Sequence, residues 1–232
     1  MKLSVIMPVY NEEDTIMGIV CKVMNVKIDK ELIIIDDCST DGTRETLRKI
    51  DNNDNNIRVI YHGKNMGKGV AIRTAIKYVT GDIIIIQDAD LEYEPEDYYE
   101  LTRPVIEGKA DVVYGSRELL KENKWSYYRY ALGGRFLSWL TNLLYHSNIT
   151  DEPTCYKVFR ADILKRINLK CKRFEFCPEV TAKVLRKGIK IYEVPIHYYP
   201  RSIDQGKKIR FRDGLQAIWT LIKYRFLDKH SF

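Results

Sequence analysis

Two acidic residues follow a run of branched aliphatic residues near the middle of the chain. Residues 83–86 are four isoleucines, and after Gln87 come Asp88 and Asp90, one residue apart. Four isoleucines in a row predict a strand buried on both faces, as in a parallel sheet. Ligands of open α/β sheets bind beyond the carboxyl ends of the strands, where this pair lies. Two carboxylates there suit Mg²⁺ or Mn²⁺ carrying the phosphates of a nucleotide, although the pair alone would equally fit a capped turn.

The elements that must position this pair alternate between strand-like and helix-like, which predicts βαβ units and a parallel sheet. The expected strands are 3–9, 32–35, 57–61, 83–86 and 112–114, and the expected helices are 43–50, 69–79 and a segment from about residue 95. Asn11 is predicted to cap a further helix, with acidic residues 12–14 in its first turn. Three strand ends then deliver polar residues to one edge of the sheet: Tyr10, Asn11 and Glu12; Asp36 and Asp37; Asp88 and Asp90.

The second half of the chain has a different pattern, with an aromatic-rich helix at 125–146 and a basic amphipathic helix at the end. Between them we expect strands at 156–159 and 191–198 and a helix at 179–187. The helix predicted at 210–227 carries one apolar face, made of Leu215, Ile218, Trp219, Ile222 and Phe226. A basic helix of this kind is typical of an interfacial membrane anchor, but a terminal helix packed on the core has the same pattern. Residues 1–232 are predicted to form a single domain.

Composition indicates an ordinary globular protein. Of the 232 residues, 45% are hydrophobic and 30% are charged, and the net charge of +6 is spread along the chain. This distribution argues against a nucleic-acid binder and fits an acidic ligand or an anionic surface. The five cysteines form no C-x-x-C pair, as expected for reduced thiols in the cytosol. We find no signal peptide and no apolar segment long enough to span a bilayer, which predicts a soluble or membrane-surface protein.

Several motifs resemble the family 2 glycosyltransferases of the GT-A fold. They are residues 8–12 (PVYNE), 36–43 (DDCSTDGT), 88–90 (DAD), 115–117 (GSR), 151–160, Glu175-Phe176, and Arg201 with residues 206–208 (GKK). The resemblance covers nearly the whole chain and is greatest to dolichyl- and polyprenyl-phosphate mannose and glucose synthases. It implies an α/β fold with a mostly parallel central sheet flanked by helices. It also implies a nucleotide-sugar-binding half (1–117), an acceptor half (118–209) and a basic amphipathic helix (210–229).

The resemblance assigns the donor side of the site to the first half of the chain. Pro8, Tyr10 and Glu12 would line the base and ribose pocket, and Asp37 would accept hydrogen bonds from the base. Asp88 and Asp90 would face the ribose and the diphosphate bound to Mg²⁺ or Mn²⁺. Glu92 stands where the family often has Gln as a third metal ligand, and a carboxylate can serve there as well. Residues 67–69 (GKG) are expected to open a helix, and a contact with the donor is one alternative, but we interpret them mainly as a turn.

The acceptor implied by the resemblance is a polyprenyl or dolichyl phosphate, which is already ionised and needs cations to hold it. The candidates are Arg117, Arg129, Arg201 and Lys208, with Arg135 as an alternative to Arg129. Asp90, Arg117 and Asp151 are the predicted catalytic residues, and Asp151 would act as a base or orient its neighbours. The reaction would be an inverting, metal-dependent hexosyl transfer at the cytoplasmic face of a membrane.

Departures from the family leave alternatives open. Residues 155–157 (CYK) replace the Ser-Gly-Phe that is common in mannose synthases, so GDP-mannose, UDP-glucose and UDP-N-acetylhexosamine all stay candidate donors. Many relatives have C-terminal membrane helices that this sequence lacks, so the membrane would be reached through the terminal helix or a membrane partner subunit. A soluble transferase acting on a glycan or protein hydroxyl, and a non-catalytic nucleotide-sugar-binding module, are the competing hypotheses.

Overall fold

The computed structural model describes residues 1–51, 54–124, 127–201 and 211–227. Within these residues, seven strands form one sheet in the order β3-β2-β1-β4-β6-β5-β7. The strands are β1 (Leu3–Val9), β2 (Lys30–Asp36), β3 (Ile57–Tyr61), β4 (Ile83–Ile86), β5 (Val112–Ser116), β6 (Lys157–Arg160) and β7 (Ile191–Pro195). Their pairing is parallel except at β6, which runs antiparallel to both of its neighbours. The prediction of a mostly parallel sheet is confirmed.

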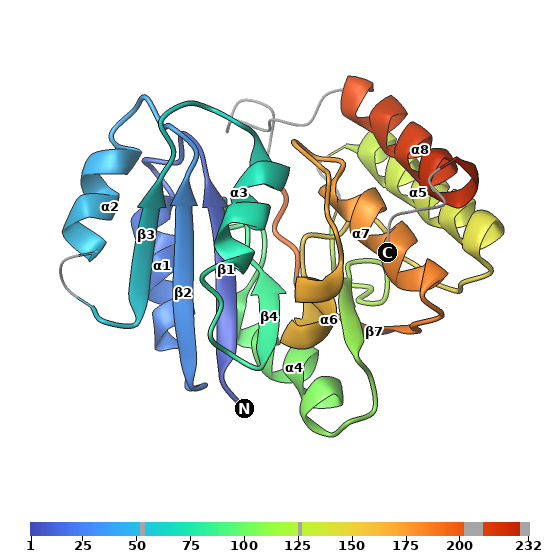
Figure 1. The fold of residues 1–232 in the computed structure, drawn as a ribbon, viewed down its shortest axis with the longest axis horizontal. Coiled ribbons are helices and arrows are strands. Elements are labelled where there is room, and N and C mark those ends of the chain that lie inside the picture. The colour runs from blue at the N-terminus through green and yellow to red at the C-terminus, as the bar shows by residue number, and fades with distance from the viewer. Residues whose placement is uncertain (52–53, 125–126, 202–210, 228–232) are drawn as a thin grey trace.

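Helices flank the sheet on both faces (Figure 1). They are α1 (Ile16–Asn25), α2 (Thr43–Asp51), α3 (Lys68–Ile76), α4 (Tyr98–Ile106), α5 (Tyr128–Tyr145), α6 (Ala161–Arg166), α7 (Phe176–Arg186) and α8 (Phe211–Phe226), with a short 3₁₀ turn, η1 (Pro95–Asp97), before α4. The helices α5, α7 and α8 pack together beyond the β7 end of the sheet (Figure 1). Among the described helices, none is long and apolar enough to cross a membrane.

The isoleucine run behaves as its composition predicts. All four side chains of β4 are buried, between β1 on one side and β6 on the other. The register of β1 against β2 pairs Val9 with Asp36, so these two parallel strands end together. The loops that follow β1, β2 and β4 therefore meet at one edge of the sheet, as expected from the sequence.

The prediction for the start of α1 was wrong. Asn11 does not cap this helix, and the helix begins only at Ile16, without an acidic residue in its first turn. The reason is that the loop after β1 bonds to the loop after β2 instead of turning directly into a helix. The Asn11 amide donates to the Ser39 hydroxyl, and the Glu13 carboxylate accepts from the Gly42 amide just before α2.

The apolar face expected on the terminal helix α8 is not the face that packs on the protein, so the core-packing alternative for that face is wrong. Ala217, Leu221 and Tyr224 are buried, whereas Leu215, Trp219 and Phe226 are exposed. The buried side of α8 packs on α5 and α7, which hydrophobicity alone did not indicate. We also missed α6, which at six residues is too short to show a helical period.

Candidate active site

The loops after β1, β2 and β4 each contain a non-glycine residue with a left-handed backbone. These are Asn11 (φ 50°), Cys38 (φ 65°) and Leu91 (φ 60°). A positive φ is unfavourable for residues with a Cβ atom and is typical of segments held in place for function. Leu91 lies between Asp90 and Glu92, and its side chain packs near Gly18 of α1. The three tight bends turn the polar residues of the loops toward the carboxyl edge of the sheet.

Asp37 lies in this edge, but its carboxylate is engaged within the protein. It is buried, and it accepts hydrogen bonds from the backbone amides of Met66 (2.9 Å) and Gly67 (2.6 Å). A nitrogen of the buried His62 ring lies 2.8 Å from the same carboxylate. Asp37 thus fixes the loop that leads into α3, and any contact with a nucleotide base would be additional to these bonds.

Asp88 forms an ion pair with Lys68, the first residue of α3. The Lys68 ammonium lies 2.6 Å from the Asp88 carboxylate. Burial disfavours the charged lysine, but the charge and hydrogen bond of Asp88, together with the neighbouring Cys155 and Cys177, raise the pKa of Lys68. The preceding Gly67 has φ 93°, and a Cβ there would collide with the Lys172 carbonyl oxygen. The glycine thereby lets Lys68 enter the site, at the start of the helix that residues 67–69 were expected to open.

Asp90 and Glu12 both bind the guanidinium group of Arg201. One terminal nitrogen of Arg201 lies 3.0 Å from Glu12, and the other lies 3.2 Å from Asp90. Burial, together with the charges of Asp88 and Glu92, raises the pKa of Asp90 to about 7, although Arg201 opposes this. The ionised form of Asp90 is therefore destabilised by two neighbouring carboxylates and stabilised by a cation.

The Glu92 carboxylate is bound by groups that follow β7. Its carboxylate accepts a hydrogen bond from the Arg201 backbone amide (2.8 Å) and one from the Tyr198 hydroxyl (3.2 Å). In the part of the chain that the structure describes, no three His, Cys, Asp or Glu side chains are grouped so that they could hold one metal ion. Asp88 and Asp90 fit a divalent cation by their chemistry and mutual repulsion, whereas Glu92 would have to exchange partners to join them.

Arg117, the residue after β5, forms a bidentate ion pair with Asp151. The Arg117 Nε and one terminal nitrogen each donate to a different Asp151 oxygen at 2.7 Å, and the Arg117 amide donates as well. The guanidinium also lies over the Tyr198 ring, 5.1 Å from its centre. Because both Asp151 oxygens are occupied, this geometry favours an orienting role over that of a base.

The remaining predicted residues are placed as follows. Pro8 and Tyr10 are half-buried at the end of β1. Arg129 is the second residue of α5, and its side chain lies outside the described part of the structure, as does the whole of Lys208. Arg135 pairs on the surface with Glu118, beside Arg117. Tyr198, which touches both Glu92 and Arg117, had no distinguishing sequence pattern.

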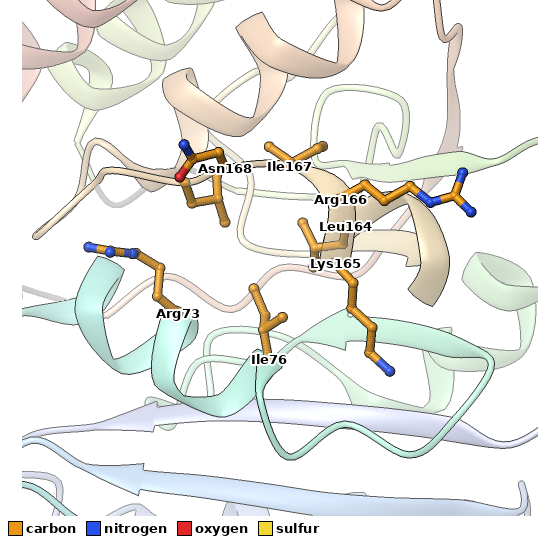
Figure 2. A pocket seen from close by; sticks show the side chains of 8 residues that line it. Arg73, Ile76, Leu164, Lys165, Arg166, Ile167 and Asn168 are labelled. Carbon is orange, nitrogen blue, oxygen red and sulfur yellow. The ribbon is translucent and has the colours of Figure 1, made fainter. Parts of the chain in front are cut away.

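A pocket elsewhere on the molecule does not coincide with this site. Figure 2 shows this pocket, of about 350 Å³, lined by α3 residues such as Arg73 and Ile76 and by residues 164–169 of α6 and the following loop. None of the site residues predicted above lines it. Its cations are partly engaged, since Lys165 donates to the Val79 carbonyl and Arg73 to that of Cys171. We therefore locate the candidate active site at the carboxyl edge of the sheet.

The sequence matches the family model described as "Glycosyl transferase family 2" over residues 4–167, which include Asp37, Asp88, Asp90 and Asp151. The chain belongs to glycosyl transferase family 2. It is a glycosyltransferase, as the motifs predicted. The match ends before Arg201, so the residue that binds Asp90 from the second half lies outside the segment on which membership rests.

Curated relatives include two that act on dolichyl phosphates. The chain is 32% identical to UDP-N-acetylglucosamine–dolichyl-phosphate N-acetylglucosaminyltransferase of Methanococcus voltae, over 95% of this chain and 94% of that protein. It is 27% identical to dolichol-phosphate mannosyltransferase of Pyrococcus furiosus, over 97% of this chain but only 64% of that protein. The chain thus spans nearly the full length of the first relative and about two thirds of the second.

Solved structures share the fold at lower identity. Glucosyl-3-phosphoglycerate synthase of Mycobacterium tuberculosis, in complex with Mn²⁺, UDP and phosphoglyceric acid, superimposes with a TM-score of 0.73. It is 20% identical, and the match covers 99% of this chain and 80% of that one. The same enzyme with Mg²⁺ and UDP gives a TM-score of 0.74 at 19% identity. These likenesses confirm the GT-A fold class.

Proposed function

We propose that this glycosyltransferase moves a hexose from a nucleoside-diphosphate sugar to a polyprenyl or dolichyl phosphate. The observation that carries the proposal is the pairing of charges across the edge of the sheet. Carboxylates from the first half (Glu12, Asp88 and Asp90) face cations at the start of α3 and after β7 (Lys68 and Arg201). A site with both negative and positive side chains suits a metal-bound diphosphate beside a second anionic substrate, because carboxylates bind the metal and cations bind the anions.

On the donor side, Asp88 and Asp90 would hold Mg²⁺ or Mn²⁺, which when bound neutralises charge on the diphosphate leaving group. Lys68 lies within an ion-pair distance of Asp88 and would donate to the same diphosphate. Pro8, Tyr10 and Glu12 would border the base and ribose, because they follow β1 at the same edge. Asp37 would support this pocket by fixing the loop from Met66 to Gly67.

On the acceptor side, we assign the lipid phosphate to the neighbourhood of Arg117 and Arg201. Asp151 holds the Arg117 guanidinium in one orientation, and the Tyr198 ring supports it from one face. A phosphate monoester is ionised at neutral pH, so its oxygen needs positioning and charge compensation more than a general base. Arg129 and Lys208 remain proposed as further phosphate ligands.

The donor sugar is the finer part of the proposal. The Methanococcus voltae relative, named for UDP-N-acetylglucosamine, aligns with this chain over nearly its whole length. We therefore rank UDP-N-acetylglucosamine first among the three candidate donors, ahead of UDP-glucose and GDP-mannose. The lipid acceptor places the reaction at a membrane, for which we propose the cytoplasmic face.

The test is to incubate the purified protein and Mn²⁺ with each radiolabelled donor. Each donor is offered dolichyl phosphate, free dolichol or a soluble glycan, and lipid-linked label is extracted into organic solvent. We expect label only with the phosphorylated lipid. Asp90→Asn is the catalytic control, and Arg117→Lys should impair transfer more than binding of the donor nucleotide. Equal labelling of dolichol or of the glycan would refute the acceptor and favour a hydroxyl-directed transferase.

A further inference from the structure

The two outer helices α5 and α8 each expose a row of large apolar side chains. On α5 the row is Leu132, Phe136, Trp139 and Leu143, and on α8 it is Leu215, Trp219, Ile222 and Phe226. Both rows have the spacing i, i+4, i+7, i+11, which aligns them along one side of a helix. Trp139 is 57% exposed and Trp219 is 55% exposed, and only Ile222 is half-buried. Large apolar side chains arranged in rows differ from the scattered ones of an ordinary surface.

The opposite sides of these helices attach them to the protein. Ala217, Leu221 and Tyr224 of α8 are buried, and leucines of α5 pack against this cluster. The Tyr145 hydroxyl at the end of α5 donates to the Leu221 carbonyl at 2.6 Å. The exposed rows are therefore not needed to hold α5 and α8 in place. Figure 1 shows the two helices side by side beyond the end of the sheet.

The charges on the same two helices are almost all positive. The described side chains of α5 and α8 include four basic ones and a single acidic one: Arg135, Arg212, Lys223 and Arg225, against Asp213. Exposed tryptophan, phenylalanine and leucine flanked by arginine and lysine are the composition of helices that lie in a membrane interface. An anionic bilayer surface attracts this positive charge, whereas a neutral surface does not.

The apolar rows are also connected to the acceptor side of the site. Arg135 of α5 pairs with Glu118, the residue after Arg117. Gly134 of α5 approaches Pro153, two residues after Asp151. The helix that carries one apolar row thus touches both loops of the Arg117–Asp151 pair. A lipid whose tail lies in a bilayer against α5 would have its phosphate near these loops.

We propose that the apolar rows of α5 and α8 together form a docking face that lies in the headgroup region of an anionic lipid bilayer. The choice of a lipid over other occupants rests on the proposed lipid-phosphate acceptor and on the charge of the two helices. The face differs from the single terminal anchor expected from the sequence, since half of it comes from α5. It holds the Arg117–Asp151 pair beside the membrane surface without a membrane-spanning segment.

The experiment measures sedimentation of the full chain with vesicles that contain neither donor nor acceptor. One set is pure phosphatidylcholine, and the other is an equal mixture of phosphatidylcholine and phosphatidylglycerol. We expect binding to the anionic vesicles at least about tenfold tighter than to the neutral ones, and weaker at high salt. Equal binding to both sets, or no binding, overturns the proposal.

Variants then locate the face. The double variant Trp139→Ser, Trp219→Ser should lose at least about tenfold in vesicle affinity, because it removes apolar area that the bilayer would cover. Tyr192→Ser on β7 and Met17→Ser on α1 remove side chains that are also exposed but lie elsewhere, and should change nothing. Unchanged binding by the double variant, or equal loss in the controls, refutes the assignment.

Tryptophan fluorescence keeps the test valid if the serine variants fail to fold. Two variants each retain a single tryptophan, either Trp139 or Trp219, with the other two of the three tryptophans changed to Phe. Vesicles of brominated lipid should quench the fluorescence of both variants. Absence of quenching refutes the bilayer. A dimer that shields both residues from acrylamide, or a membrane subunit needed for binding, would assign the face to a protein instead. Because the vesicles lack acceptor, failed transfer with intact binding refutes the proposed function alone.

Discussion

Arg201 and Asp90 are paired across the site, with a guanidinium nitrogen 3.2 Å from a carboxylate oxygen, although 111 positions separate them in the sequence. The same guanidinium binds Glu12, and the Arg201 amide binds Glu92. Arg201 thus neutralises the carboxylate that we assign to the metal. A divalent cation at Asp90 would compete with Arg201, and Arg201 would then be released toward an incoming anion.

Removing this arginine should therefore strengthen metal binding in the absence of nucleotide. We expect Arg201→Gln to bind Mn²⁺ about tenfold more tightly, or by about 1.4 kcal/mol, because a competing cation is lost. Titration followed by electron paramagnetic resonance of free Mn²⁺ measures this without substrates. Arg135→Gln, which breaks only a surface pair with Glu118, is the matched control. Weaker Mn²⁺ binding by Arg201→Gln would mean that the arginine supports the metal site.

The two acidic pairs at the strand ends should respond differently to the same substitution. Asp90→Asn should lower kcat/KM by at least about 100-fold, with little change in Tm, because it removes a proposed metal ligand. Asp36→Asn should instead destabilise the fold by about 2 kcal/mol, because it removes the buried carboxylate that pairs with Arg44. Thermal unfolding and initial rates separate the two effects. Full activity of Asp90→Asn, or of the wild type in EDTA, would contradict the metal assignment.

Lys68 should contribute to donor binding. We expect Lys68→Gln to weaken binding of the donor nucleotide about tenfold or more, since one cation facing the diphosphate is lost. Calorimetry without acceptor measures this step separately from transfer, and Lys68→Arg should recover part of the affinity. Lys77→Gln, at the far end of α3 and exposed, is the control. An unchanged nucleotide affinity would leave Lys68 with only its structural pairing to Asp88.

The stability of the protein should fall in acid partly through Glu31. Burial alone would raise the pKa of Glu31, but hydrogen bonds from Ser4 and Thr80 outweigh it and lower the pKa to about 2. A depressed carboxylate pKa gives stability that is complete above the ordinary value near 4.5 and is lost as the pH falls toward 2. With allowance for partial exposure, the contribution is about 1–2 kcal/mol.

Urea unfolding of the wild type and Glu31→Gln at a series of pH values tests this expectation. The variant should be less stable near pH 7, and the difference should shrink between pH 4.5 and 2, the window set by the shift of Glu31. Glu100→Gln, which breaks an exposed pair with Arg103 on α4, serves as the control. If the difference in unfolding free energy between the two proteins did not depend on pH, the hydrogen bonds of Glu31, and not its charge, would be what stabilises the protein.

Local pattern was sufficient for the sheet but not for its connections. The isoleucines of β4 and the alternation before them predicted the parallel strands, because strands buried on both faces have a distinctive composition. The prediction for the loop after β1 was wrong because Asn11 forms hydrogen bonds with residues 39 and 40. These residues are too far away in the sequence for a local pattern to reveal the contact. The buried side of α8 was likewise decided by the helices it packs on.

For the site, the order of the motifs predicted which residues gather at the edge of the sheet. It did not predict their ion-pair and hydrogen-bond partners. Asp88 and Asp90 lie where expected, yet their partners are Lys68, from a segment interpreted as a turn, and Arg201, which was assigned to the acceptor phosphate. Asp37 was expected to face a base, and its bonds to His62 and to two amides come from tertiary contacts. Charge partners are long-range properties that spacing does not encode.

The position of β6 has a consequence for how the chain folds during synthesis. This strand pairs with both β4 and β5, so it joins the two parts of the sheet and can do so only after residue 160 has been made. Until then, β4 is a bare edge of four isoleucines beside β1, and β5 has no neighbour upstream. Unpaired apolar edges promote aggregation of incomplete chains. We therefore expect the nascent N-terminal half to need rapid arrival of β6, or a chaperone, to avoid aggregation on the ribosome.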